Sequence, residues 1–123
     1  KYFIPFLNKD NKNVFAFLSA RVGSISDNKL GGWYSYRASK TALNQILKNF
    51  SIEIKRSNPK SIFIGLQPGT VKSNLSKPFE KNVHSENLFT PDYSATKLLE
   101  VIDGLTSDDS GKFYAWNGEE IQP

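Results

Sequence analysis

Two short apolar segments of the chain have the pattern of buried strands. Residues 14–18 and 61–66 are rich in Val, Ile and Phe and contain no charged side chain. Uninterrupted apolar runs of this length are typical of strands that are buried on both faces of a parallel sheet. A polar turn precedes the first segment, and Pro68-Gly69 follows the second. We therefore expect two neighbouring strands in the interior of a sheet.

The segment between these strands has the period of a helix. A Gly-containing loop, residues 21–32, comes first. Apolar residues then recur at steps of three and four, namely at Leu43, Ile46, Leu47, Phe50 and Ile54. This spacing predicts a helix over about residues 33–56 with these side chains on its inner face, and Asn58-Pro59 ends it. A strand, a long helix and a second strand form a βαβ unit, whose strands are parallel neighbours joined by a right-handed crossover.

The remainder of the chain predicts a loop, a second helix and a last strand. Residues 72–89 are polar and irregular, which is typical of a lid over a binding site. Thr90-Pro91-Asp92 indicates a helix start, with a capping Thr and a Pro in the first turn. The inner face of this helix is expected to contain Ala95, Leu98, Leu99, Ile102 and Leu105. A strand over residues 112–116 then precedes a hairpin-type turn at Asn117-Gly118.

The order of these elements, β-α-β-loop-α-β, indicates an α/β fold. A parallel sheet needs helices on both faces, and two helices with about three strands do not complete one. We therefore expect residues 1–123 to form a single partial domain, the C-terminal half of a doubly wound, Rossmann-like parallel sheet. The open strand edge and the apolar helix faces of such a half sheet favour association into a homo-oligomer.

Composition excludes several classes of protein. Hydrophobic residues make up 38% of the chain and charged residues 23%, which is unlike a disordered segment. No apolar run is long enough to cross a membrane. The chain has no Cys and one His, His84, so it offers no disulfide scaffold, no thiolate zinc site and no His-rich metal cluster. We therefore expect no metal site.

Charge and the N-terminal segment complete this picture. The net charge of +4 comes from scattered residues, with no block of five like charges. This indicates a solvated surface rather than a nucleic-acid contact. The chain contains no Met and begins at Lys1 without a signal-like segment. We therefore expect a cytoplasmic protein whose N-terminus has been trimmed, or a fragment.

Tyr36 and Lys40 carry the candidate chemistry. On a helix, residues four apart lie on the same face and interact. A nearby ammonium lowers the pKa of a phenol from about 10, so the pair can donate a proton to a carbonyl oxygen or accept one from an alcohol. On spacing alone, an amphipathic helix with a surface Lys explains the pair better. Its position beyond the carboxyl end of the first strand, where open α/β sheets bind ligands, favours a functional role.

Four segments, in order, resemble the short-chain dehydrogenase/reductase family over nearly the whole chain. Residues 18–25 (Leu-Ser-Ala-Arg-Val-Gly-Ser-Ile) resemble the family's serine segment, and Tyr36 to Lys40 is similar to its catalytic Tyr-x-x-x-Lys. Residues 67–73 (Gln-Pro-Gly-Thr-Val-Lys-Ser) resemble its Pro-Gly-x-Val-x-Thr cofactor segment, with Ser in place of Thr. The end of the chain, residues 111–121, is similar to that of the C-factor and sniffer-type carbonyl reductases.

The resemblance implies an NAD(P)-dependent oxidoreductase, with NADP or NAD as cofactor and a small-molecule carbonyl or alcohol as substrate. Tyr36 would be the general acid-base residue, and Lys40 would assist it and hold the nicotinamide ribose. The implied cofactor-binding residues are Leu18, Ser19, Tyr36, Lys40, Pro68, Gly69, Val71 and Ser73. Residues 72–89 would be the substrate lid. Trp33 either lines the substrate pocket or packs inside the fold.

Two departures from the family pattern leave a second interpretation open. The family's second Ser, which polarises the substrate carbonyl, is replaced by Ala20, and Ser24 could take this catalytic role if its loop folds inward. The sequence also has no G-x-G-x-x-G phosphate loop, so the Gly-rich half that binds the cofactor and separates NAD from NADP is absent from it. The alternative is a truncated or degenerate, non-catalytic relative that acts as an interaction module.

Overall fold

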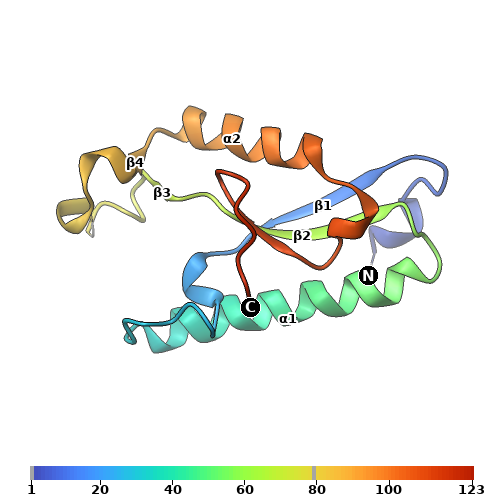
Figure 1. The fold of residues 1–123 in the computed structure, drawn as a ribbon, viewed down its shortest axis with the longest axis horizontal. Coiled ribbons are helices and arrows are strands. Elements are labelled where there is room, and N and C mark those ends of the chain that lie inside the picture. The colour runs from blue at the N-terminus through green and yellow to red at the C-terminus, as the bar shows by residue number, and fades with distance from the viewer. Residues whose placement is uncertain (1, 79) are drawn as a thin grey trace.

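The computed structural model describes residues 2–78 and 80–123, and within them the main sheet has three parallel strands (Figure 1). These are β1 (Asn13–Leu18), β2 (Ser61–Gln67) and β5 (Phe113–Ala115), in the spatial order β1-β2-β5. All six residues of β1 pair with β2 in parallel. The prediction that the two apolar segments form parallel neighbours is therefore confirmed.

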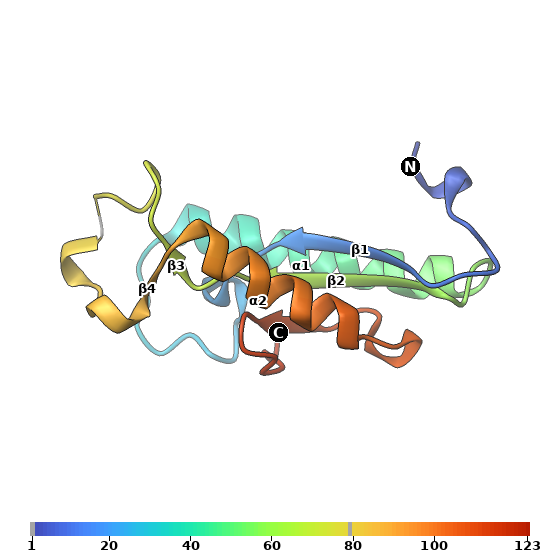
Figure 2. The same cartoon turned by 90° about the horizontal axis from the view of Figure 1, so that it is seen from above.

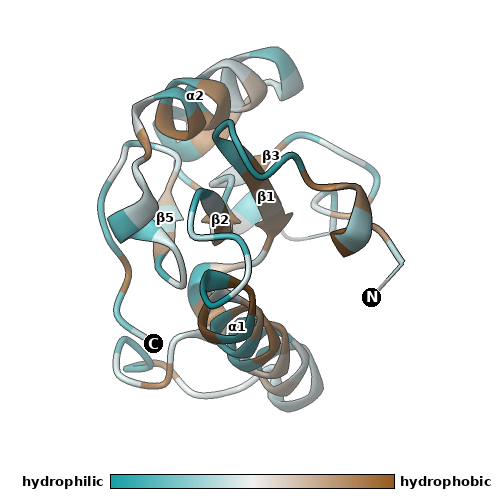
Figure 3. Cartoon of the chain, turned by 90° about the vertical axis from the view of Figure 1, so that its right-hand side faces the viewer, coloured by the Kyte–Doolittle hydropathy of each residue, from teal (hydrophilic) through white to brown (hydrophobic). Residues whose placement is uncertain are grey.

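Two helices cover the sheet from opposite faces. α1 (Tyr34–Lys55) lies on one face and α2 (Pro91–Gly104) on the other (Figure 3). Because the chain steps in the same direction from β1 to β2 and from β2 to β5, the two crossovers have opposite hands. The β1-α1-β2 crossover is right-handed, as predicted, and the β2-α2-β5 crossover has the uncommon left hand. The long connection after β2 carries the chain around the end of the sheet to the face that α2 covers (Figure 1).

The inner face of α1 is narrower than the sequence pattern predicts. Leu47 and Ile54 are buried. Leu43 and Phe50 are half-buried. Ile46, in contrast, is 50% exposed, so its assignment to the inner face is wrong. Successive helical residues point about 100° apart, and the buried stripe around Leu47 leaves its neighbour Ile46 at the side of the helix.

α2 begins as predicted, but its inner face is shifted. The Thr90 hydroxyl caps the helix by accepting a hydrogen bond of 3.2 Å from a backbone N–H of the first turn. Three predicted residues pack in the core, namely Leu98, Ile102 and Leu105. Ala95 and Leu99 are exposed, Leu99 at 59%, so the prediction is wrong for them, and Val101 packs in the core instead. In the described part of the chain, neither helix is long and apolar enough to cross a membrane.

The core lies in two layers, one on each face of β2. The layer under α1 contains Leu47, Phe113, Ala115 and Ile121, and the layer under α2 contains Ile62, Ile64, Leu66 and Leu105. β2 is buried along nearly its whole length, as predicted for an inner strand. The last three residues of β1 are exposed, Leu18 at 60%, so the prediction of burial on both faces is wrong for β1. The reason is that, among the described residues, no strand pairs with the outer edge of β1.

The opposite edge of the sheet is covered by the C-terminal tail, residues 117–123. After the predicted hairpin-type turn, the Ile121 N–H donates to the Phe113 carbonyl at 2.8 Å. The Ala115 N–H donates to the Glu119 carbonyl at 2.8 Å. The sheet therefore has one covered edge, at β5, and one open edge, at β1.

The connection between β2 and α2 contains a short second sheet. β3 (Thr70–Val71) pairs in parallel with β4 (Leu88–Phe89). The last two residues of the predicted lid, 72–89, therefore belong to a strand rather than to an irregular loop, because they pair with the turn after β2. The described residues of this segment, 72–78 and 80–89, project beyond the end of the main sheet (Figure 2). Phe79, which is part of the predicted lid, lies outside the described residues.

Candidate active site

Several predicted site residues meet at the edge of the sheet where β1 and β2 end and α1 begins. A cavity of about 470 Å³ lies between the start of α1, the turn after β2 and the first part of the lid. This volume is in the range of small-molecule sites. The described residues that line it are Trp33, Tyr36, Pro68, Gly69, Thr70, Val71, Ser73, Leu75 and Ser76. Tyr36 thus shares a cavity with the predicted cofactor residues Pro68, Gly69, Val71 and Ser73.

Lys40 lies beside Tyr36, although it does not line the cavity itself. Its Nζ is 5.7 Å from the centroid of the Tyr36 ring. The same Nζ donates a hydrogen bond of 3.0 Å to the carbonyl oxygen of Leu18, the last residue of β1. Tyr36 is 46% exposed, so a molecule in the cavity can reach it. The backbone carbonyl of Leu18 therefore meets the predicted pair. Leu18 itself is 60% exposed and does not line the cavity.

A tight contact between α1 and the turn after β1 holds this part of the helix. A Cβ atom on Gly23 would lie 2.8 Å from the Cβ of Lys40, which is closer than side chains pack. One turn further along, the buried Asn44 accepts a hydrogen bond of 2.6 Å from the Ser19 hydroxyl. Ser19, a predicted cofactor residue, is therefore bound to α1 and does not line the cavity. Sequence reasoning missed Asn44, although a polar residue on the apolar face of a helix was a signal for it.

Ser24 does not face the cavity either. It is 2% exposed, and its hydroxyl donates a hydrogen bond to the Gln122 carbonyl and accepts one of 3.0 Å from the Asp27 N–H. The loop folds inward, but toward the C-terminal tail rather than toward Tyr36. The structure therefore gives the Ser24 hydroxyl a structural place, and Ala20 has no hydroxyl to offer. Among the described residues, the side-chain donors that line the cavity are the hydroxyls of Tyr36, Thr70, Ser73 and Ser76 and the indole N–H of Trp33.

Side chains behind the cavity hold the Pro68-Gly69 turn, and sequence reasoning missed two of them, Ser94 and Phe89. The hydroxyl of Ser94, a buried residue of α2, donates to the Pro68 carbonyl at 2.8 Å. Gly69 has φ of +76°, which favours Gly, and a Cβ there would lie 2.5 Å from the Phe89 ring. The Phe89 ring packs edge-on against Trp116, with 4.6 Å between the ring centroids. The turn, the end of the lid and the end of β5 are thus joined.

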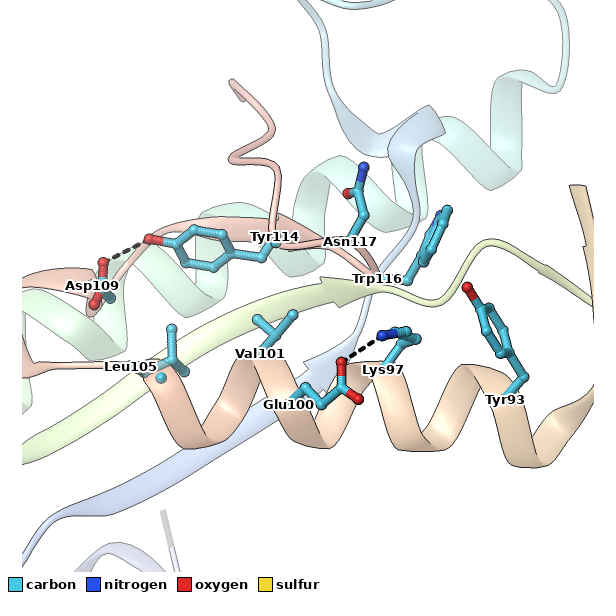
Figure 4. Close-up of a pocket in the computed structure, with 11 residues that line it drawn as sticks. Tyr93, Lys97, Glu100, Val101, Leu105, Asp109, Tyr114, Trp116 and Asn117 are labelled. Carbon is cyan, nitrogen blue, oxygen red and sulfur yellow. Dashed lines mark hydrogen bonds and ion pairs between the residues drawn. The ribbon is translucent and has the colours of Figure 1, made fainter.

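A second hollow, of about 600 Å³, lies between α2 and β5 (Figure 4). Here the Tyr114 hydroxyl donates to Asp109 at 2.6 Å, and the Lys112 ammonium donates at 3.0 Å. The Tyr114 hydrogen bond, with one from the Thr106 N–H, lowers the pKa of Asp109 well below its usual range. Burial and the bond to Asp109 raise the pKa of Tyr114 to about 12. These bonds close the turn before β5, and none of the predicted site residues lines this hollow.

Comparison with known proteins finds relatives along nearly the whole chain, although no family model matches it. A 1-hydroxy-2-glutathionyl-2-methyl-3-butene dehydrogenase of Rhodococcus sp. (strain AD45) is 37% identical over 118 residues, which are 96% of this chain and 49% of the relative. The C-signal protein of Myxococcus xanthus is 32% identical over 96% of this chain and 66% of its own length. The chain thus spans only about half to two thirds of these relatives.

A solved structure supports the same relationship. The NADPH-bound carbonyl reductase from chicken fatty liver superimposes with a TM-score of 0.76 and 30% identity, over 91% of this chain and 43% of the reductase. This match confirms the predicted α/β fold as part of a Rossmann-like parallel sheet. The fold, the relatives and the ordered motifs agree, and the chain belongs to the short-chain dehydrogenase/reductase family.

Proposed function

We propose that this chain carries the catalytic residues of an NAD(P)-dependent oxidoreductase that interconverts a carbonyl compound and its alcohol. Two of the relatives are named as a dehydrogenase and a carbonyl reductase. The observation that supports the proposal most directly is the place of Tyr36 on the cavity, with Lys40 beside it. The chain spans only part of the length of these relatives. We therefore also propose that the 123 residues are active by themselves.

Tyr36 is the proposed general acid-base residue. During reduction its hydroxyl donates a proton to the carbonyl oxygen as negative charge develops there, and during oxidation it accepts the alcohol proton. The Lys40 ammonium, held by the Leu18 carbonyl, stabilises the negative charge left on the Tyr36 oxygen. When bound, a nicotinamide cofactor supplies or accepts the hydride.

The residues present fit the nicotinamide end of such a cofactor. An ammonium has three N–H donors, and the Leu18 carbonyl takes one of those on Lys40. The others, with the Tyr36 hydroxyl, suit the two hydroxyls of a ribose. The neutral segment from Pro68 to Val71 forms the cavity wall on which a nicotinamide ring would lie, and Ser73 lies beside it. The sequence offers no Gly-rich loop for the pyrophosphate, so these residues fit only one end of the cofactor.

The alternative proposal is a non-catalytic interaction module. Two observations favour it. The Ser24 hydroxyl is engaged with the tail, so the cavity lacks the donor that the family pattern places beside the tyrosine. The outer edge of β1 is open and apolar, which is typical of a surface that pairs with another chain.

A titration of NADPH and of NADH into the 123-residue chain, followed by cofactor fluorescence, separates the two proposals. The mass in solution is recorded in parallel. We expect saturable binding, and turnover of an added carbonyl compound such as 4-nitrobenzaldehyde. Tyr36→Phe should keep the binding and abolish the turnover, whereas Tyr34→Phe, an exposed neighbour on the same helix, should keep both. Absence of binding at millimolar cofactor would favour the interaction module.

A further inference from the structure

A buried polar pair joins the end of β1 to α1. Ser19 and Asn44 are each 7% exposed, and the Ser19 hydroxyl donates a hydrogen bond of 2.6 Å to Asn44 Oδ1. The Asn44 amide also donates to the Gly23 carbonyl at 3.4 Å. Asn is a poor helix former, and a buried amide costs free energy unless it is hydrogen-bonded. The proposed mechanism uses neither side chain, so it does not account for their burial.

The peptide group between Leu18 and Ser19 is held from two sides. Its N–H, on Ser19, donates to the Leu66 carbonyl of β2 at 2.8 Å. Its carbonyl, on Leu18, accepts a hydrogen bond of 3.0 Å from the Lys40 ammonium. The N–H and the carbonyl of a planar trans peptide point in opposite directions. The bond to β2 therefore turns the Leu18 carbonyl away from β2, and Lys40 meets it there.

Lys40 and Asn44 lie about one turn apart on the same face of α1. Both contact the segment after β1, because a Cβ atom on Gly23 would lie 2.8 Å from the Lys40 Cβ and 3.1 Å from the Asn44 amide nitrogen. Such packing limits how near the helix can come, but it has no preferred direction. The Ser19–Asn44 hydrogen bond is directional, since hydrogen bonds weaken steeply away from linear geometry. It therefore fixes the position of α1 along the helix axis.

We propose that Asn44 is a positioning residue, which through Ser19 sets the register of α1 against the end of β1 and so the place of the Lys40 ammonium beside Tyr36. A shift of about 1 Å at a reacting group can cost on the order of 100-fold in rate. The inference rests on the proposed function for the reaction that Lys40 assists. A pair that served stability alone could be replaced by apolar side chains without loss of rate.

The double variant Ser19→Ala/Asn44→Leu of the 123-residue chain tests the inference. It removes both polar groups together, and the Gly23 carbonyl keeps the Thr41 hydroxyl at 2.9 Å. The melting temperature should stay close to the parent value, because replacing both partners of a buried hydrogen bond by apolar groups is nearly neutral. With NADPH and 4-nitrobenzaldehyde, kcat should fall about tenfold. The KM for the aldehyde should be kept, because neither residue lines the cavity.

An exposed polar pair on the same helix supplies the matched control. The Gln45 amide donates a hydrogen bond of 3.1 Å to Asn49, and both residues are exposed. Gln45→Ala/Asn49→Ala removes this pair in the same way and should keep the parent kcat. An equal loss of kcat in the two double variants would overturn the proposal.

The position of Lys40 is measured separately, without cofactor, from the ¹³C resonance of the Leu18 carbonyl. Loss of a hydrogen-bond donor moves this resonance upfield, and Lys40→Met gives its value without the bond. The resonance should move toward this value in Ser19→Ala/Asn44→Leu. If that variant does not fold, Asn44→Gln, which keeps the amide but moves it by a methylene, should shift the resonance in the same direction.

The outcome for the inference and the outcome for the proposed function can be told apart. A moved Leu18 resonance in Ser19→Ala/Asn44→Leu, without turnover by the parent chain, would support the role of Asn44 and count against the reductase. Turnover by the parent, with the same kcat and the same Leu18 resonance in the double variant, would support the reductase and overturn the role of Asn44. A lowered melting temperature with both readouts unchanged would make the pair merely structural and overturn it as well.

Discussion

The Lys40 ammonium donates a hydrogen bond of 3.0 Å to the carbonyl oxygen of Leu18, the last residue of β1. This bond connects the helix that carries Tyr36 to the strand end beside the cavity. It keeps a positive charge 5.7 Å from the centroid of the Tyr36 ring, and no carboxylate among the described residues forms an ion pair with Lys40. The charge therefore remains available to the phenol oxygen and to a bound molecule.

Lys40→Met should separate this charge from the packing of the side chain, because Met keeps an unbranched apolar stem. We expect turnover of 4-nitrobenzaldehyde with NADPH to fall about 100-fold or more, since the phenolate of Tyr36 loses its stabilising cation. Lys40→Arg should recover part of the loss. Lys48→Met, an exposed position on the same helix, should retain the parent rate in the same steady-state assay. Equal rates for the parent and Lys40→Met would contradict the role of Lys40.

Replacing Trp33 by Gly and by Ala should reveal the backbone strain. Both changes remove the indole, and they differ in how well the new residue tolerates a φ of +47°. Gly adopts this region freely, whereas Ala costs about 1 kcal/mol more. We therefore expect Trp33→Gly to melt roughly 4 °C or more above Trp33→Ala, by circular dichroism. Identical melting temperatures would mean that the backbone at this position is not strained.

The hydrogen bonds on Asp109 should make stability depend on pH in the acid range. They lower the pKa of Asp109 in the folded state. The contribution of Asp109 to the free energy of unfolding is therefore fully present above the unfolded pKa of about 4, and it is lost as the pH falls toward the folded pKa. We expect Asp109→Asn to cost about 2 kcal/mol at pH 7 and to flatten the decline of the melting temperature below pH 4. Asp108→Asn, at the exposed neighbour, should melt like the parent at every pH. The same decline in Asp109→Asn and in the parent would show that other groups cause it.

The open edge of β1 should pair with a second chain. Its backbone N–H and carbonyl groups have no strand partner among the described residues, and no charged side chain protects its sequence, Asn-Val-Phe-Ala-Phe-Leu. We propose that the chain self-associates here, with a mass in solution that exceeds 13.9 kDa and rises with concentration in light scattering. Ala16→Lys, at an exposed position of this strand, should return it to the monomer mass.

A control on another surface makes this prediction specific. Leu99 is as exposed as the end of β1, but it lies on α2. Leu99→Lys should therefore leave the mass unchanged if pairing occurs at the strand edge. A monomer at all concentrations, or an equal effect of the two Lys variants, would exclude self-association through β1.

Local sequence patterns were enough to predict the main strands, both helices and most of the residues that line the cavity. The strands and helices follow from local periodicity, and the Thr90 cap needs only residues of its own turn. Tyr36 and Lys40 are neighbours because four residues make about one helical turn. The Pro68-Gly69 turn reaches the same cavity because parallel strands end at the same edge of the sheet.

Which surfaces are covered and which hydroxyls are engaged follows from contacts between segments that are far apart in the sequence. The Ser24 hydroxyl binds a carbonyl 98 residues away, so no local pattern could reveal that it turns from Tyr36. Ile46 and Leu99 follow the apolar period but are exposed, because a narrow sheet covers only a stripe of each helix. The left hand of the second crossover likewise depends on where distant segments meet, which spacing along the chain does not encode.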